Sequence, residues 1–451
     1  MFSRVLVANR GEIAVRVIRA LHELEIEAVA IYSTADKESM HVRLADRAVA
    51  VGPAPASQSY LNIPSVIAAA TTTGCEAIHP GYGFLAENPA FVAACEDNEL
   101  VFVGPTAEVM ARMGDKVQAK AELKRAGVPL VPGSDGTVSP MEARSLAAEL
   151  GYPVLLKAAA GGGGKGMRIV DVDDGLEGAF RTAAAEAEAA FGDGSLYVEK
   201  LVRPARHVEI QVLADAQGGV LTLGERECSI QRRHQKLIEE SPSPGVSPET
   251  REEMEAAAER AVKAIGYRNA GTFEFLVGPD QSFYFIELNA RLQVEHPVSE
   301  LVTGIDLVRE QLRIAAGEAL PATGRAPRGG HAIEIRINAE NPARDFAPAP
   351  GRITGFRPPL GPGVRLDTFV EAGTTVPPYY DSLLAKLVVW DDDRAAAISR
   401  SLRALGELSV TGIPTTRELA IQILRSEQFA SGRYSTSFLE ESGERLAVTV
   451  E

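Results

Sequence analysis

Cysteine is scarce in this sequence, which contains only Cys75, Cys95 and Cys228. The three are widely spaced and form neither a Cys-x-x-Cys pair nor a Cys/His cluster with the spacing of a metal site. This pattern disfavours a disulfide framework, and we infer a reducing compartment.

Long runs of lysine and arginine are also missing, and the formal net charge is −15. A surface that neutralises nucleic-acid phosphates needs concentrated cations, so we expect no nucleic-acid partner. Any phosphate that this protein binds should occupy a local basic pocket.

Nowhere do ~18 apolar residues follow one another without interruption, and the first ten residues lack the apolar core and small-residue cleavage site of a signal peptide. We therefore expect a cytoplasmic protein with no membrane association. Hydrophobic residues make up 45% of the 451 residues and charged residues 24%, a composition typical of a globular protein. The length predicts about two to four domains.

The first hundred residues alternate short apolar runs, at 5–8, 28–31 and 100–103, with a helical pattern at 12–24. Such alternation predicts a parallel sheet with helices on both faces. Of the glycine fingerprint that a dinucleotide-binding fold would carry after its first strand, only Gly11 is present. Nicotinamide binding is therefore disfavoured.

Two later helices have clear boundary signals. Ser139 and Glu142 have the spacing of a capping box, and Gly151 provides a stop. From 247 to 265 a helical apolar face follows Ser247, and Gly266 ends it.

A glycine-rich loop, residues 158–166, separates two predicted strands at 153–157 and 167–170. Four successive glycines between basic residues allow backbone amides to approach phosphate oxygens, although a flexible surface hairpin is the alternative. The loop is not a P-loop, because the residue after Lys165 is Gly166 and not a Ser/Thr that could bind magnesium. Metal-binding carboxylates must then come from elsewhere.

Glu274 and Glu287 are the candidates, on predicted strands at 272–276 and 283–289. If the hairpin centres between residues 279 and 280, Glu287 is a diagonal neighbour of Glu274, roughly 7–8 Å away on the same face. Two close carboxylates suit Mg²⁺, but both could instead face solvent on an ordinary hairpin. Asn289, Arg291 and Glu295 would continue this face if the chain stays extended.

Segment 224–236 is rich in cations, and alone it would be interpreted as a solvated loop. Here it has candidate anions to bind. Cys228 within it has no base partner in the sequence and receives no role.

Three stretches, 79–88, 224–236 and 285–296, give the sequence its strongest resemblance, which is to the biotin carboxylase family of the ATP-grasp superfamily. The resemblance covers essentially the whole chain and implies a multidomain α/β and α+β fold. It implies a Rossmann-like, parallel-sheet pre-ATP-grasp domain at 1–114 and an ATP-grasp domain at 115–330. The latter includes a mobile glycine-loop lid at about 132–202, and a mixed α/β C-terminal biotin carboxylase domain follows at 331–446.

The resemblance also implies the site residues. The ATP site would contain Lys116, Lys157, Gly161, Gly162, Gly163, Gly164, Lys165, Gly166, Met167, Glu199, Lys200, Val202, His207, Gln231, His234 and Leu276. Mg²⁺ or Mn²⁺ would be held by Glu274, Glu287 and Asn289. The bicarbonate pocket would contain Lys236, Arg291, Gln293, Val294 and Glu295, and the biotin ring would contact Tyr82 and Arg336.

The implied reaction is ATP-dependent carboxylation of biotin by bicarbonate through carboxyphosphate, the first half-reaction of acetyl-CoA or acyl-CoA carboxylase. Glu295 is expected to be the general base, Arg291 to hold bicarbonate, Lys236 to offset phosphate charge and Arg336 to stabilise the ureido oxyanion. An alternative is another ATP-grasp ligase with an acylphosphate intermediate, such as a carbamoyl-phosphate synthetase half. A regulatory subunit without chemistry is disfavoured, because a degenerate site has no reason to retain these charged residues together.

No Met-Lys-Met biotin-attachment sequence occurs in the chain. We therefore expect biotin to arrive on a separate biotin carboxyl carrier protein, and a carboxyltransferase to complete the system. The resemblance further suggests a homodimer.

Overall fold

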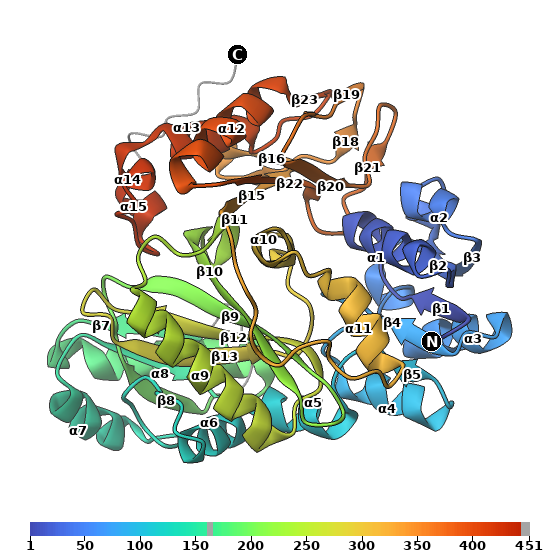
Figure 1. Cartoon of the computed structure of the whole chain (residues 1–451). Helices are drawn as coiled ribbons and strands as arrows, with labels where there is room; N and C mark the ends of the chain where they lie inside the picture. The colour runs from blue at the N-terminus through green and yellow to red at the C-terminus, as the bar shows by residue number, and fades with distance from the viewer. Residues whose placement is uncertain (160–165, 443–451) are drawn as a thin grey trace.

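The computed structural model describes residues 1–159 and 166–442, and for Lys116 and Val117 it describes the backbone only. In Figure 1 the N-terminal region, in blue, lies beside a large central sheet, and the C-terminal region, in brown and red, lies above it. A small unit with α7 and α8 lies at the opposite end of the central region.

The N-terminal region is a five-stranded parallel sheet in the order β3-β2-β1-β4-β5, which confirms the predicted parallel sheet. Val5 and Val7 of β1 pack into a core with α1, whereas Leu6 packs with α3 and α4 on the other face. Alternate side chains of a strand point to opposite faces, and this explains why helices cover both. The elements are β1 (Arg4–Val7), α1 (Gly11–Glu23), β2 (Glu27–Ser33), α2 (Met40–Leu44), β3 (Arg47–Gly52), α3 (Ile63–Thr73), β4 (Ala77–His79), α4 (Pro89–Asp97), β5 (Val101–Phe102), α5 (Ala107–Gly114) and α6 (Lys116–Arg125).

The small unit is a three-stranded antiparallel sheet, β7-β6-β8, that shares its own hydrophobic core with two helices. The predicted pairing of the two strands that flank the glycine loop is confirmed, with Lys157 opposite Met167. The capping box of Ser139 and Glu142 also forms, and Gly151 ends that helix. The elements are α7 (Pro140–Leu150), β6 (Val154–Ala158), β7 (Met167–Val170), α8 (Leu176–Phe191) and β8 (Leu196–Lys200).

The central sheet has nine strands, with β13-β12-β9-β10-β11-β15-β22-β20 in order and β14 beside β10. Helix α9 packs on it, capped by Ser247 and ended by Gly266 in the left-handed conformation, as predicted. The elements are β9 (Arg206–Ala214), β10 (Val220–Arg232), β11 (Gln235–Ser241), α9 (Pro248–Ile265), β12 (Asn269–Val277), β13 (Phe283–Asn289), α10 (His296–Thr303) and α11 (Leu307–Ala315).

The hairpin of β12 and β13 forms, but its predicted register is wrong. Glu274 lies directly opposite Glu287, because the strands pair Val277 with Phe283 and a bulge between Glu274 and Phe275 adds one residue. The chain also does not stay extended beyond Asn289, as the continued polar face through Arg291 and Glu295 would require. Instead the backbone bends, and Glu295 becomes the N-cap residue of α10.

The C-terminal region extends the central sheet, because β15 pairs with β11 across the expected boundary at 330/331. Helices α12 and α13 share a hydrophobic core with β15 and β22. The main elements are β14 (Gly324–Arg325), β15 (His331–Asn338), β20 (Val364–Thr368), β22 (Leu383–Asp391), α12 (Arg394–Glu407), β23 (Ser409–Thr411), α13 (Arg417–Arg425), α14 (Glu427–Ala430) and α15 (Phe438–Ser442). In the described part of the chain, no helix combines the length and apolar composition needed to cross a membrane.

Candidate active site

A cleft of about 2140 Å³ lies between the regions and brings most of the predicted site residues together. Those that line it are Tyr82, Lys157, Met167, Glu199, Lys200, Val202, His207, Gln231, His234, Lys236, Glu274, Leu276, Glu287, Asn289, Arg291, Gln293, Val294, Glu295 and Arg336. They come from segments up to 254 residues apart, between Tyr82 and Arg336, so only the tertiary fold unites them.

Some predicted residues are not placed in this cleft, and one that lines it, Lys200, is engaged by another partner. Gly161, Gly162, Gly163, Gly164 and Lys165 lie outside the described residues, as does the side chain of Lys116. Gly166 is buried at the base of the loop, where its carbonyl accepts a hydrogen bond from the Ala158 N–H at 3.0 Å. Lys200 lines the cleft, but its Nζ donates to the carbonyl of Gly151 at 2.7 Å and is engaged there.

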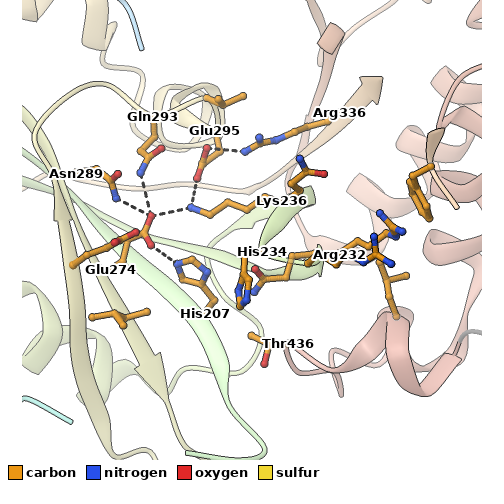
Figure 2. Close-up of a pocket in the computed structure, with 18 of the residues that line it drawn as sticks. His207, Arg232, His234, Lys236, Glu274, Asn289, Gln293, Glu295, Arg336 and Thr436 are labelled. Carbon is orange, nitrogen blue, oxygen red and sulfur yellow. Dashed lines mark hydrogen bonds and ion pairs between the residues drawn. The ribbon is translucent and has the colours of Figure 1, made fainter. Parts of the chain in front are cut away.

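Lys236 is the centre of the charged end of the cleft (Figure 2). Its Nζ lies 2.5 Å from Glu295 Oε1, 2.7 Å from Glu209 Oε2 and 3.1 Å from Glu274 Oε1. Burial opposes the charge of Lys236, but the surrounding anions raise the pKa of its ammonium well above the ordinary value. Lys236 is therefore a positively charged bridge between strands β9, β11 and β12 and the start of α10.

Glu274 is enclosed by donors. Asn289 Nδ2 donates to its Oε1 at 3.0 Å, Gln293 Nε2 donates to the same oxygen at 3.1 Å, and His207 Nε2 lies 2.8 Å from its Oε2. Burial favours the neutral acid, but Lys236 and His207 hold the pKa of Glu274 well below its usual range. Glu274 is thus an anion in the resting protein.

The donor set fits a divalent cation. Glu274 and Glu287 face one another across β12 and β13 and both line the cleft, Glu274 buried and Glu287 exposed. Carboxylate oxygens at opposed positions are the hard ligands that Mg²⁺ and Mn²⁺ prefer. Asn289 lies beside them, although its Oδ1 accepts from Arg291 Nη2 at 3.0 Å in this structure.

Glu295 connects Lys236 to Arg336. Arg336 Nη2 donates to Glu295 Oε2 at 2.9 Å, and Arg336 Nε donates to Glu239 Oε1 at 2.6 Å. Burial opposes ionisation of Glu295, but Lys236 and Arg336 hold its pKa well below the usual range. The site therefore contains an ionised carboxylate held between two cations, able to accept a hydrogen bond from a substrate.

Arg291 is oriented by three side chains and by the Leu292 carbonyl, to which its Nη1 donates at 3.2 Å. Its Nε donates to Glu87 Oε2 at 2.8 Å, its Nη1 to Gln293 Oε1 at 2.8 Å and its Nη2 to Asn289. Glu87 also accepts from the Ala290 N–H at 3.0 Å, and so ties the N-terminal region to this loop. A guanidinium with so many fixed contacts is a rigid support for a small planar anion.

At the other end of the cleft, Glu199 binds two lysines. Lys157 Nζ lies 3.0 Å from Glu199 Oε2, and Lys120 forms an ion pair with Glu199 Oε1. Burial opposes the charge of Lys157, but Glu199 and Tyr197 raise its pKa above the ordinary value. This cluster is a local basic pocket of the kind expected for phosphate.

Tyr82 lies where the N-terminal and C-terminal regions meet. Its hydroxyl donates to Glu12, and the ammonium of Lys386 lies 5.8 Å from the centre of its ring. Lys386 is completely buried and donates to the Val294 carbonyl at 3.0 Å. This contact fixes the backbone immediately before Glu295.

Sequence reasoning missed Glu209, Arg226, Lys120, Glu87, Glu239 and Thr436. Glu209 and Arg226 are fully buried and lie 2.5 Å apart. A signal for Glu209 was available, since His207, Glu209 and Gln211 alternate with apolar residues and share one face of β9. Thr436 lines the cleft near His234 but is distant in sequence from every motif (Figure 2).

Comparison with known families agrees with this arrangement. Residues 1–110 match the biotin carboxylase N-terminal domain, residues 115–323 match the ATP-binding domain of the carbamoyl-phosphate synthase L chain, and residues 334–441 match the biotin carboxylase C-terminal domain. A biotin carboxylase from Nostoc is 53% identical over 442 residues, which cover 98% of this chain and 99% of the relative.

Two crystal structures are also similar. A biotin carboxylase from Campylobacter jejuni in a β,γ-ATP complex has a TM-score of 0.95 and 48% identity, covering 98% of this chain and 99% of that one. The biotin carboxylase domain dimer of a Hydrogenobacter thermophilus 2-oxoglutarate carboxylase has a TM-score of 0.94 and 47% identity over the full length of both chains. That structure contains MgADP, ADP and bicarbonate.

Proposed function

The chain belongs to the biotin carboxylase family and catalyses ATP-dependent carboxylation of biotin, and from this premise we propose which of its residues perform the reaction. One observation carries the assignment. Lys236 bridges Glu274 and Glu295, while Arg336 holds the second oxygen of Glu295. Glu274 of the hairpin and the proposed general base Glu295 are thereby linked in a single charged cluster.

We propose that the lid end of the cleft binds ATP. Lys157 would neutralise phosphate charge, and Lys120 and Glu199 would orient it through their ion pairs. Lys116, Gly161 to Gly166, Met167, Lys200, Val202, His207, Gln231, His234 and Leu276 would complete the nucleotide site. Bound between Glu274 and Glu287 with Asn289 near, Mg²⁺ would neutralise charge on the phosphates.

Bicarbonate is a poor electrophile, so its oxygen must first attack the γ-phosphate of ATP, releasing ADP and forming carboxyphosphate. Arg291, with Lys236, Gln293 and the backbone of Val294, would hold the bicarbonate. Glu295 would accept its proton as the oxygen attacks, because its carboxylate is ionised and held in place by two cations.

Carboxyphosphate then gives CO₂ and phosphate, the released phosphate would accept the ureido N–H proton of biotin, and the ureido nitrogen bonds to the carbon of CO₂. Negative charge develops on the ureido oxygen during this step. Arg336 would stabilise that oxygen, and Tyr82 would line the pocket for the ring.

The direct test is incubation of the purified chain with ATP, Mg²⁺, labelled bicarbonate and free biotin, followed by detection of carboxybiotin. Biotin should stimulate ATP cleavage with no requirement for ammonia or an amino acid. Dependence on ammonia would instead support the alternative, a carbamoyl-phosphate synthetase-like ligase.

We also propose three domains, 1–114, 115–330 and 331–446, with residues 132–202 as a lid that closes over ATP. Support comes from the separate hydrophobic core of that unit, which contains α7, α8 and the β7-β6-β8 sheet. Limited proteolysis should show slower cleavage within 132–202 when ATP is bound. Identical cleavage with and without nucleotide would contradict the lid.

The family and the domain dimer of the 2-oxoglutarate carboxylase support a subunit of a larger carboxylase. We propose a homodimer that works with a biotin carboxyl carrier protein and a carboxyltransferase, in acetyl-CoA or acyl-CoA carboxylation. Light scattering should give about twice the 48.0 kDa of one chain. With the carboxyltransferase, carboxybiotinyl carrier made by this chain should then carboxylate acetyl-CoA. Exclusive transfer to 2-oxoglutarate would contradict the proposal that acetyl-CoA or another acyl-CoA is the acceptor.

We propose a cytoplasmic location. All three cysteines are free and buried, which suits a reducing compartment. Cell fractionation with activity measurement tests this location.

A further inference from the structure

A pair of buried glutamates lies directly behind Arg336. Glu239 on β11 and Glu334 on β15 are cross-strand partners, and both are 0% exposed. Ile238, Ile333 and Ile335 point to the hydrophobic core on the other face of the sheet, so the two glutamates share the face of Arg336. Directly opposed residues of antiparallel strands have Cβ atoms about 4.5–5.5 Å apart, which puts these carboxyl groups in reach of each other.

The hydrogen bonds of this pair are incomplete. Glu239 Oε1 accepts from Arg336 Nε at 2.6 Å, but Glu239 Oε2 and both oxygens of Glu334 are buried and accept no hydrogen bond from the described residues. Buried polar atoms almost always have partners, so three such oxygens side by side require an explanation. A proton on one carboxyl group pairs two of the three, because an acid O–H on Glu334 can donate to Glu239 Oε2.

The surrounding charges favour the same protonation state. The groups that act on the pair are Arg336, Glu295, Lys236 from β11 and Lys386 from β22. Arg336 is already shared with Glu295, and Lys386 with Glu12 at 3.2 Å. Two buried anions at opposed positions would repel one another, and cations that are each shared with other anions offset this repulsion only in part.

We propose that Glu239 is a positioning residue for Arg336, and that Glu334 holds a proton which it donates to Glu239 Oε2. This inference rests on the proposed role of Arg336 at the ureido oxygen. Burial raises the pKa of Glu239 to about 7 and raises that of Glu334 well above its usual range, in agreement with a proton on Glu334.

The contacts of Arg336 indicate what the Glu239–Glu334 pair does in the site. With Nε on Glu239 and Nη2 on Glu295, the guanidinium is fixed at two edges. No described group accepts a hydrogen bond from Nη1, and Arg336 lines the cleft, so Nη1 is left for substrate. A neutral Glu334 keeps the charge behind Arg336 at one anion, which holds the guanidinium without cancelling the charge that the ureido oxygen needs.

The experiment measures the coupling ratio, carboxybiotin formed per ATP cleaved, from about pH 6 to about pH 9. In the unmodified enzyme the ratio should rise with pH through about 7, as Glu239 ionises and Arg336 becomes fixed. Glu239→Gln should lower the ratio roughly 10-fold and remove this pH step, with the KM for ATP changed less than about 2-fold. Equal loss of ATP cleavage and carboxylation, or retention of the step, would overturn the proposal.

Substitutions at Glu334 test the proton independently, should Glu239→Gln fail to fold. Glu334→Leu removes the donor and should also lower the ratio roughly 10-fold, whereas Glu334→Gln supplies an N–H donor and should restore most of it. Equal ratios in the two variants would contradict a proton donated by Glu334.

An Arg336→Ala control separates this inference from its premise. A normal ratio in Arg336→Ala, which removes the cation, would refute the role of Arg336 itself. A low ratio there with a normal ratio in Glu239→Gln would refute the positioning role alone.

Discussion

The two faces of strand β11 carry different kinds of charged cluster. On one face Glu240 accepts from His331 at 2.6 Å and from Arg394 Nε at 2.7 Å, and Tyr434 also donates to it. We call these four residues the matched cluster. On the other face a site cluster of Lys236, Arg336, Glu209, Glu239, Glu274 and Glu295 lines or adjoins the cleft, and its carboxylates outnumber its cations.

The difference separates folding from function. Burial opposes the ionisation of Glu240, but His331 and Arg394 lower its pKa to about 2, so this anion contributes to stability. Arg226 and His207 offset part of the negative charge of the site cluster through Glu209 and Glu274, and a proton or a divalent cation would offset more. We therefore expect substitutions in the site cluster to change activity and those in the matched cluster to change stability.

The largest effect is expected for Glu295→Gln. The substitution keeps the shape of the side chain but removes the proposed general base, so bicarbonate-dependent ATP cleavage should fall about 10³-fold. A phosphate-release assay measures it. An active variant would exclude Glu295 as the base.

Arg336→Ala should slow carboxylation of free biotin about 10²-fold, because the developing oxyanion loses its cation. ATP binding should change far less, since Arg336 interacts with Glu239 and Glu295 and not with the Lys157 end of the cleft. Carboxybiotin formation and nucleotide affinity are measured in parallel. Equal losses in both would count against the assignment.

Arg394→Ala is the matched substitution on the opposite face. It removes two hydrogen bonds to buried Glu240, from Nε and from Nη2 at 2.9 Å, and should lower the free energy of unfolding by about 2 kcal/mol. Urea denaturation measures the loss. A large drop in kcat of the folded variant, with its stability unchanged, would show that the matched cluster serves activity and not stability.

The smallest effect is the acid dependence of the matched cluster. Because the pKa of Glu240 is lowered from 4.5 to about 2 on folding, its contribution is present above pH 4.5 and is lost as pH falls towards 2. The loss attributable to this group is at most about 1.4 kcal/mol per pH unit. Glu240→Gln should reduce the slope of unfolding free energy against pH in this range, and an unchanged slope would remove Glu240 as its source.

Local patterns predicted the elements well. The alternation at 5–8, the cap at Ser139 and the stop at Gly266 depend on neighbours within a few residues, and all appear in the structure. Periodicity also indicated that Glu274 belongs to a polar face, and both glutamates of the hairpin line the cleft. The exact register was wrong because the turn is centred on residue 280 and not between 279 and 280, and because a single-residue bulge, which has no signature in the alternation, adds a second shift.

The sequence by itself determined which residues form strands and helices, and through its motifs the family and the chemistry. Tertiary structure alone decided that Glu209, Glu239 and Glu295 meet around Lys236 and Arg336, since these side chains come from different strands and a helix start. The physical reason is that burial and charge pairing depend on neighbours distant in the chain. The same carboxyl group therefore becomes an anion at Glu240 and, one residue earlier, a group that titrates at about 7.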